Sequence, residues 1–138
     1  MSATMAEMAT FTDLPVIELV HPMPGFADAH TFSYAPLDEA GVLAEMRCLD
    51  RDGLKFLTVP AATFFPDYAP EIKDEDVSAL GITDVNDVLV LLIVHAGANL
   101  ATTTVNLRAP MIINTTVGKG AQVILDDQAL AVDAPLLP

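Results

Sequence analysis

Cysteine is nearly absent from this sequence, and its absence excludes two kinds of site. Cys48 is the only cysteine among the 138 residues, so the chain cannot form an internal disulfide or a cysteine-based zinc site. We expect Cys48 to be a small buried hydrophobic residue. The only histidines are His21, His30 and His95, and their spacing does not match the short intervals typical of metal ligands. The sequence therefore predicts no metal site and no cofactor.

Sequence signatures of nucleophilic and nucleotide chemistry are also missing. No G-x-S-x-G motif, phosphate-binding glycine loop or dinucleotide fingerprint occurs, and the seven glycines are scattered. Two acidic pairs could in principle serve acid and base chemistry, Asp50 with Asp52 and Asp126 with Asp127. Both pairs lie at predicted turns, where solvated acids are common. We therefore predict a non-enzyme without catalytic residues.

Two other functions stay open at this stage. A small β-barrel enzyme or ligand carrier could use His30 or His95 together with a carboxylate, provided that these groups converge in a concave pocket. A subunit of a structural oligomer is the other option, because an exposed edge strand could pair between chains. Between monomer and oligomer, we expect a monomer.

Long hydrophobic runs are missing as well. The longest one, Val88–Val94, is far shorter than the roughly 20 residues that a transmembrane helix needs, and its Val, Leu and Ile content favours a buried strand. Residues Met1–Thr10 show no basic segment ahead of an apolar core, which a secretory signal would have. We therefore expect a cytoplasmic protein with no membrane partner.

Basic residues are scarce: six Lys and Arg stand against nineteen Asp and Glu, for a net charge of −13. So few cations cannot neutralise many phosphates, which argues against direct binding of nucleic acid. A basic protein partner fits this charge better. The alternative is that the acidity simply confers solubility.

Short strand-like runs recur along the chain, separated by Pro, Gly and Asp. Hydrophobic residues make up 52% of the sequence and its mean hydropathy is +0.46, which argues against disorder. The pattern predicts a mainly β protein, a compact antiparallel β-barrel-like single domain over residues 1–138 with one or two short helices. Disorder of residues 1–12 stays open. The predicted strands are Val16–Val20, Thr31–Ala35, Val42–Leu49, Leu54–Val59, Asp87–His95, Thr102–Leu107, Met111–Val117 and Ala121–Leu125.

Two glycines mark hairpin turns. Gly53 follows Asp52 between two strand-like runs, where a positive φ suits glycine. Gly118 marks a second hairpin, which we expect to pair Ile112–Ile113 with Val123–Leu125.

Two helical segments are predicted. One begins at Asp74, which can cap it, and ends at Gly81. The other is a single helical turn at Phe64–Tyr68, where Pro66 and Pro70 prevent a longer helix.

Polar residues recur inside the apolar stretch Thr103–Asn114. Thr104, Asn106 and Arg108 alternate with apolar residues, so a strand here would have one polar face. Pro110 cannot donate to a ladder and therefore belongs at a strand start, an edge or a bulge.

Recognition of a partner protein is the chemistry that these residues favour. The stretch Phe64–Tyr68 sets aromatic rings beside an acid, although the rings could instead plug one end of a barrel. For Asn106 and Arg108 the alternative is bonding to neighbouring loops. The residues predicted to bind protein are Phe65, Asp67, Tyr68, Glu71, Asn106 and Arg108.

Several short motifs occur in a characteristic order between Val16 and Leu136. They are Met23–Phe26, Leu54–Val59, Phe65–Tyr68, Asn106–Pro110, Ile112–Asn114 and Gln122–Leu125. In this order and spacing the chain resembles the bacterial flagellar assembly factors of the FliW family.

The resemblance implies a small cytoplasmic protein that is not an enzyme and has a compact antiparallel β fold. Its implied partners are flagellin and the carbon storage regulator CsrA, an RNA-binding dimer that represses flagellin translation. A factor freed by flagellin export would bind the regulator away from its RNA surface. It would thereby antagonise RNA binding without competing for it and restore flagellin synthesis.

Overall fold

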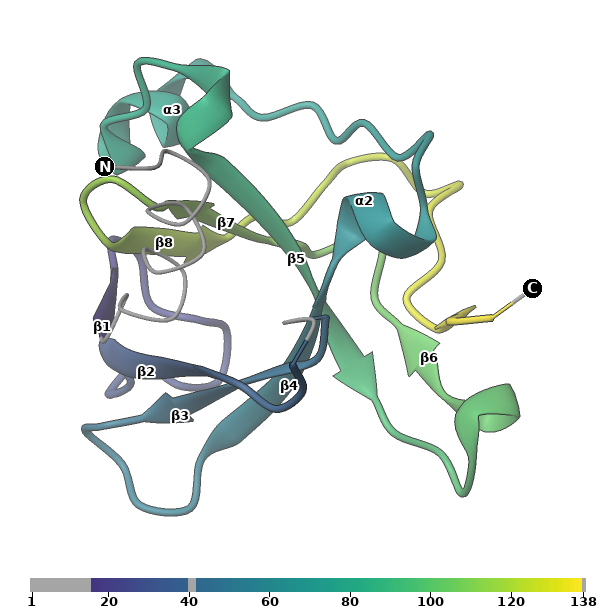
Figure 1. Ribbon diagram of the computed structural model, residues 1–138. Coiled ribbons are helices and arrows are strands. Elements are labelled where there is room, and N and C mark those ends of the chain that lie inside the picture. Colours follow the sequence, from purple (N-terminus) through teal and green to yellow (C-terminus); the bar gives the residue numbers. More distant parts are fainter. Residues whose placement is uncertain (1–15, 40–41, 138) are drawn as a thin grey trace.

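The computed structural model describes residues 16–39 and 42–137, so the option of disorder in residues 1–12 lies outside the described residues. Nine strands, two short α-helices and two 3-10 helices (η) make up the described chain (Figure 1). In chain order they are β1 (Val16–Leu19), β2 (Thr31–Pro36), β3 (Ala44–Cys48), β4 (Lys55–Pro60), α2 (Ala61–Phe64), α3 (Asp74–Leu80), η1 (Val85–Asp87), β5 (Val88–His95), η2 (Leu100–Thr102), β6 (Thr104–Val105), β7 (Met111–Asn114), β8 (Lys119–Gln122) and β9 (Ala134–Pro135).

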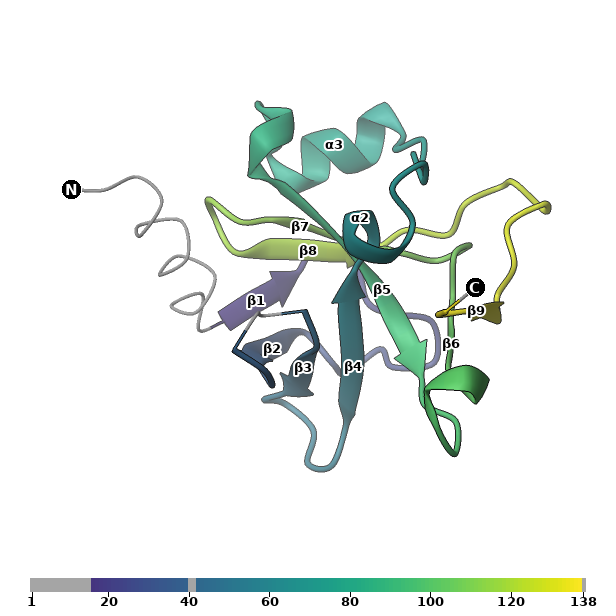
Figure 2. The ribbon, with the colours of Figure 1, turned by 45° about the vertical axis from the view of Figure 1, so that its right-hand side comes forward.

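Seven of these strands close into a barrel. Their order is β4-β3-β2-β1-β8-β7-β5, and β5 pairs back with β4. All the pairs are antiparallel except β1 with β8, which is parallel. Beyond the barrel, β6 and β9 continue the sheet from the end of β5, as Figure 2 shows. The mainly β, barrel-like fold predicted from the sequence is confirmed.

The barrel interior is filled by side chains that alternate along the strands. Ile17 on β1, Phe32 on β2 and Met46 on β3 are fully buried and belong to one cluster, which also holds Cys48. Alternation of buried and exposed residues is what a strand with one face on a core produces. Each large apolar side chain buried in this way contributes about 1.5–3 kcal/mol. The prediction that Cys48 is a buried hydrophobic residue is confirmed.

Strand β5 is the central element of the sheet. It pairs with β7 along its first half, with β4 along its second half and with β6 at its end. Leu91 and Leu92 are consecutive and both fully buried, although they point to opposite faces. The run Val88–Val94 is therefore a strand covered on both faces, as its composition predicted.

Helix α3 lies over β7 and β8 (Figure 2). Its N-cap is Lys73, and no side chain makes a capping hydrogen bond. Asp74 is the first residue inside the helix, so the prediction that Asp74 caps the helix is wrong. Asp74 still lies where a negative charge opposes the helix dipole. The helix ends at Gly81 with φ +68°, as predicted, and the Asn114 Nδ2 donates to the carbonyls of Leu80 and Gly81.

Both predicted hairpins are present. Gly53 and Gly118 have φ of +82° and +72°, values that favour glycine. The predicted register of the second hairpin is wrong, because Ile112 faces Ala121 and Ile113 faces Gly120. The turn is tight, with the N–H of Gly118 donating to the carbonyl of Asn114, and a tight turn fixes which residues face each other.

The predicted helical turn at Phe64–Tyr68 is present as a single hydrogen-bonded turn, in which the N–H of Tyr68 donates to the carbonyl of Phe65 at 2.9 Å, and the α-helix lies before it. Helix α2 begins directly after Pro60 and ends at Phe64. Pro60 is the N-cap residue, and its extended backbone (φ −65°, ψ 129°) is typical of the residue that precedes a helix. Residues Phe65–Lys73 then form the linker between α2 and α3.

Candidate functional site

The chain turns a corner at Asn106–Pro110, between β6 and β7. Both strands pair with β5, yet Val105 pairs with Val94 and Met111 with Leu91. Five residues therefore face only two residues of β5, and the chain bulges out of the ladder. The predicted strand Thr102–Leu107 is correct only at Thr104–Val105, because Thr102 belongs to η2 and the chain leaves the ladder after Val105. Pro110 precedes β7, in agreement with its predicted place at a strand start.

The Asn106 side chain is the local cause of this corner. Its Oδ1 accepts hydrogen bonds from the backbone N–H of Arg108 at 2.9 Å and of Ala109 at 3.2 Å. An asparagine that bonds the backbone ahead of it favours a turn over a continuing strand. The alternation of polar and apolar residues predicts a strand because it does not include the competition between the Asn106 side chain and the strand ladder for backbone hydrogen bonds.

Arg108 ties the corner to the segment that follows β8. Its Nε donates to the carbonyl of Leu130 at 3.0 Å, and its Nη2 donates to the carbonyl of Gln128 at 2.9 Å. Asn106 and Arg108 thus use their polar groups within the chain, which was the alternative considered for both. Contact of these two residues with a partner remains a prediction.

Tyr68 ties the corner to the linker from the other side. Its phenolic O–H donates to the carbonyl of Leu107 at 2.6 Å. Burial raises the pKa of Tyr68 to about 12, so the phenol is neutral and can donate at physiological pH. The corner therefore holds the linker and the post-β8 segment (Val123–Ala131) together.

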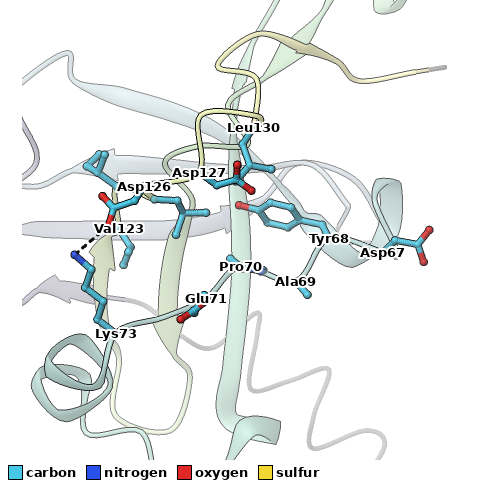
Figure 3. Close-up of a pocket in the computed structure, with 12 residues that line it drawn as sticks. Asp67, Tyr68, Ala69, Pro70, Glu71, Lys73, Val123, Asp126, Asp127 and Leu130 are labelled. Carbon is cyan, nitrogen blue, oxygen red and sulfur yellow. Dashed lines mark ion pairs between the residues drawn. The ribbon is translucent and has the colours of Figure 1, made fainter.

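A groove of about 390 Å³ lies between these two segments (Figure 3). Residues Asp67–Glu71 and Lys73 form its linker wall, and Val123–Asp127 with Leu130 form the opposite wall. Lys73 and Asp126 face each other across it, with Nζ and Oδ2 3.6 Å apart. Apart from Lys73, the charged groups of the walls are all carboxylates.

Three of the six predicted binding residues line this groove, namely Asp67, Tyr68 and Glu71. Phe65 does not line it and packs, half-buried, against a core cluster that contains Val59 and Leu92. Asn106 and Arg108 lie at the corner, where they hold the walls without lining the groove.

Sequence reasoning missed most of the second wall. By sequence, Asp126 and Asp127 are ordinary turn acids, and Ile124 belongs to a strand without a binding role, although it is 53% exposed and lines the groove. The signal available in the sequence is the apolar Ile124 followed closely by the acidic pair. The linker wall that these residues face lies more than fifty positions earlier in the chain. Lys73 carried no signal of its own.

The enzyme or carrier alternative required His30 or His95 to converge with a carboxylate. His95 does share a second hollow, of about 330 Å³, with Asp133. His30 precedes β2, and β3 and β4 separate that strand from β5, which ends at His95. The backbone N–H groups of His30 and Thr31 donate to Asp50 and lower the pKa of that carboxyl. The two histidines therefore do not converge on one site, and the hollow beside His95 holds a single carboxylate, that of Asp133.

Metal-binding clusters and membrane-spanning helices are both absent from residues 16–39 and 42–137. No group of three or more His, Cys, Asp or Glu side chains there is arranged to hold a metal ion. No helix in the same ranges has the length and apolar character needed to cross a membrane.

Comparison with known proteins gives a consistent result. A family model described as FliW protein matches residues 1–136. The flagellar assembly factor FliW of Caldanaerobacter subterraneus subsp. tengcongensis is 30% identical over 128 residues, covering 92% of this chain and 85% of the relative. The FliW of Heliobacterium modesticaldum is 36% identical over 114 residues, covering 83% and 74%.

A solved structure supports the same relationship. The crystal structure of a flagellar assembly factor FliW superimposes with a TM-score of 0.82 at 26% identity, covering 90% of this chain and 86% of that one. The barrel, the order of its motifs and the family model agree, so this chain belongs to the FliW family of flagellar assembly factors.

Proposed function

We propose that this flagellar assembly factor acts in the cytoplasm by binding two proteins, flagellin and the carbon storage regulator CsrA. Bound to the regulator, it lowers RNA binding without occupying the RNA surface and so relieves repression of flagellin translation. Membership of the FliW family and the charge of the folded surface support this proposal.

The observation that carries the proposal is how the chain uses its few cations. Four of its six basic side chains form ion pairs with its own acids, and a fifth, Arg108, donates to backbone carbonyls. Most of the nineteen acids are thereby left without a cation to neutralise them. The ion pairs are Arg47 and Lys55 with Glu45, Arg51 with Asp28, and Lys73 with Asp126.

An acidic surface of this kind complements a basic protein. RNA-binding proteins present basic patches, and opposite charge on two partners raises their association rate and restricts which partners bind. For antagonism without competition, the contact must lie outside the RNA surface and favour a regulator state with lower RNA affinity.

Binding and competition measurements test the proposal. Calorimetry of the purified chain with flagellin, and separately with the regulator, should give a saturable complex in each case. Labelled RNA is then titrated with the regulator at increasing chain concentrations. Antagonism without competition predicts that the apparent Kd for RNA rises to a plateau at saturating chain, whereas an apparent Kd that keeps rising in proportion to the chain concentration would indicate competition and refute it. Absence of both complexes would refute the proposed function itself.

One variant tests where the regulator binds. Asp67→Lys should weaken the regulator complex by about 1–3 kcal/mol, or about 5- to 150-fold in Kd, if the exposed Asp67 lies in the interface. Asp52→Lys makes the same charge change at the exposed β3–β4 turn and serves as the control. Equal effects of both variants, with the fold intact by circular dichroism, would place the interface elsewhere.

A further inference from the structure

The post-β8 segment presents a strand edge without a partner. The N–H groups of Val123 and Leu125 donate inward, to the carbonyls of Pro110 at 2.9 Å and Arg108 at 2.8 Å. Backbone groups alternate along an extended chain, so those of Ile124 point the opposite way. Within the described ranges Ile124 makes no backbone hydrogen bond.

The neighbouring strand stops short of this edge. β1 pairs with β8 only as far as Gly120, which accepts from the N–H of Val20 at 2.9 Å. Beyond that point no described strand pairs with the outer side of the segment. An unpaired edge of this kind can add an extended strand from another protein. Ile124 is 53% exposed, so it is open to such a contact.

The groove beside this edge carries an excess of negative charge. Asp67, Glu71 and Asp127 line it and form no ion pair within the part of the chain that the structure describes. Asp126 is paired with Lys73, but its side chain is 88% exposed. An ion pair so open to water is weak, so a cation from a partner can displace Lys73 readily.

The groove also offers an apolar surface. The ring of Tyr68 and the side chain of Leu130 lie between the acids, and Val123 and Leu125 continue the surface into a buried cluster. A groove with acids at its rim and apolar groups within it fits an extended segment on which basic and apolar residues alternate.

We propose that this groove binds an extended basic segment of the RNA-binding regulator. The segment pairs with the backbone of Ile124, sets an apolar side chain against Tyr68 and Leu130, and brings a cation that replaces Lys73 at Asp126. Lys73 is therefore an internal competitor for the site. This inference rests on the proposed function, because it assigns one of the two proposed partners to the groove.

A peptide and two matched lysine variants test the inference. The probe is a short, end-blocked, fluorescein-labelled peptide in which arginine and valine alternate, measured by anisotropy. Lys73→Gln should raise its affinity about 3- to 10-fold, because the internal competitor is gone. Lys119→Gln removes the same charge from the exposed β7–β8 hairpin, outside the groove, and should change affinity less than about twofold.

If Lys73→Gln and Lys119→Gln raise the peptide affinity equally, the inference is overturned, because the peptide would then be attracted by the overall negative charge of the protein. Two more results are required by the inference. Asp127→Asn should weaken binding of the peptide, because it removes one of the groove's negative charges. Methylation of the peptide's central backbone nitrogens should abolish binding, because strand addition needs those N–H groups. Retained binding of the methylated peptide would exclude strand pairing at Ile124.

The full-length regulator separates this inference from the proposed function. If the regulator binds the wild-type chain but responds equally to Lys73→Gln and Lys119→Gln, the groove assignment is wrong and the proposed function stands. If neither regulator nor flagellin binds the wild-type chain, the proposed function fails, whatever the peptide does. Tighter regulator binding by Lys73→Gln alone supports both.

Discussion

Replacing Asn106 with alanine removes the side chain that turns the chain at the corner. Its Oδ1 accepts from two backbone N–H groups, those of Arg108 and Ala109. Ala109 is 5% exposed, so its N–H cannot regain a hydrogen bond from water without local opening. A buried donor left without a partner costs about 1–3 kcal/mol, and the half-buried N–H of Arg108 adds less. We expect Asn106→Ala to lower the free energy of unfolding by about 2–4 kcal/mol in total.

Asn106→Asp is the matched variant. A carboxylate oxygen can accept both hydrogen bonds, and the ladder bond from the Asn106 N–H to Ile93 does not involve the side chain. Stability should therefore stay within about 1 kcal/mol of the wild type, since the only new term is a charge near Asp133 in the same hollow.

Urea unfolding followed by far-ultraviolet circular dichroism measures both variants, since the sequence has no tryptophan. With an m-value of about 2 kcal/mol/M, the alanine variant should unfold at a midpoint lower by about 1–2 M. If the two variants lose equal stability, the acceptor oxygen is not what holds the corner. A loss below about 0.5 kcal/mol in Asn106→Ala would refute the reasoning altogether.

Two further predictions concern pH and backbone packing. The pKa of Tyr68 is raised to about 12, so the folded state holds the phenolic proton more tightly than the unfolded chain does. The stability that this group contributes is present below about pH 10 and is lost as the pH rises toward 12. Urea titrations should show a smaller alkaline loss in Tyr68→Phe, with a remainder from Tyr34, whose pKa burial also raises; an unchanged loss would contradict this. Gly97→Ala sets a Cβ 2.3 Å from the Oγ1 and 2.4 Å from the carbonyl oxygen of Thr102, so it should cost about 1–3 kcal/mol. The exposed neighbour Ala98→Ser should stay within about 0.5 kcal/mol, and equal losses in the two variants would show that the close approach is not the cause.

The barrel was predictable because its signals are local. Alternation of apolar residues along β1, β2 and β3 follows from the two-residue period of a strand, whatever its neighbours are. Gly53, Gly81 and Gly118 mark chain reversals because only glycine adopts a positive φ without strain. Chain order alone did not predict the parallel pairing of β1 with β8 or the short strand β9, since both join segments far apart in the sequence.

The candidate site was only half predictable for the same reason. Asp67, Tyr68 and Glu71 could be singled out from an aromatic and acidic motif, but the wall they face comes from Val123–Leu130. The hydrogen bond from Tyr68 to Leu107 spans 39 positions, and that from Arg108 to Leu130 spans 22. No local pattern encodes such contacts, because they depend on how the closed barrel brings its loops together.

The sequence by itself determined the fold class, the acidity and the exclusion of an internal disulfide, since each depends on composition or on neighbours along the chain. Only the tertiary structure decided where the scarce cations go, that Asn106 and Arg108 bond within the chain, and that Lys73 spans a groove to Asp126. Cysteine scarcity is a count, whereas the pairing of a charge depends on distances that exist only after the chain has folded.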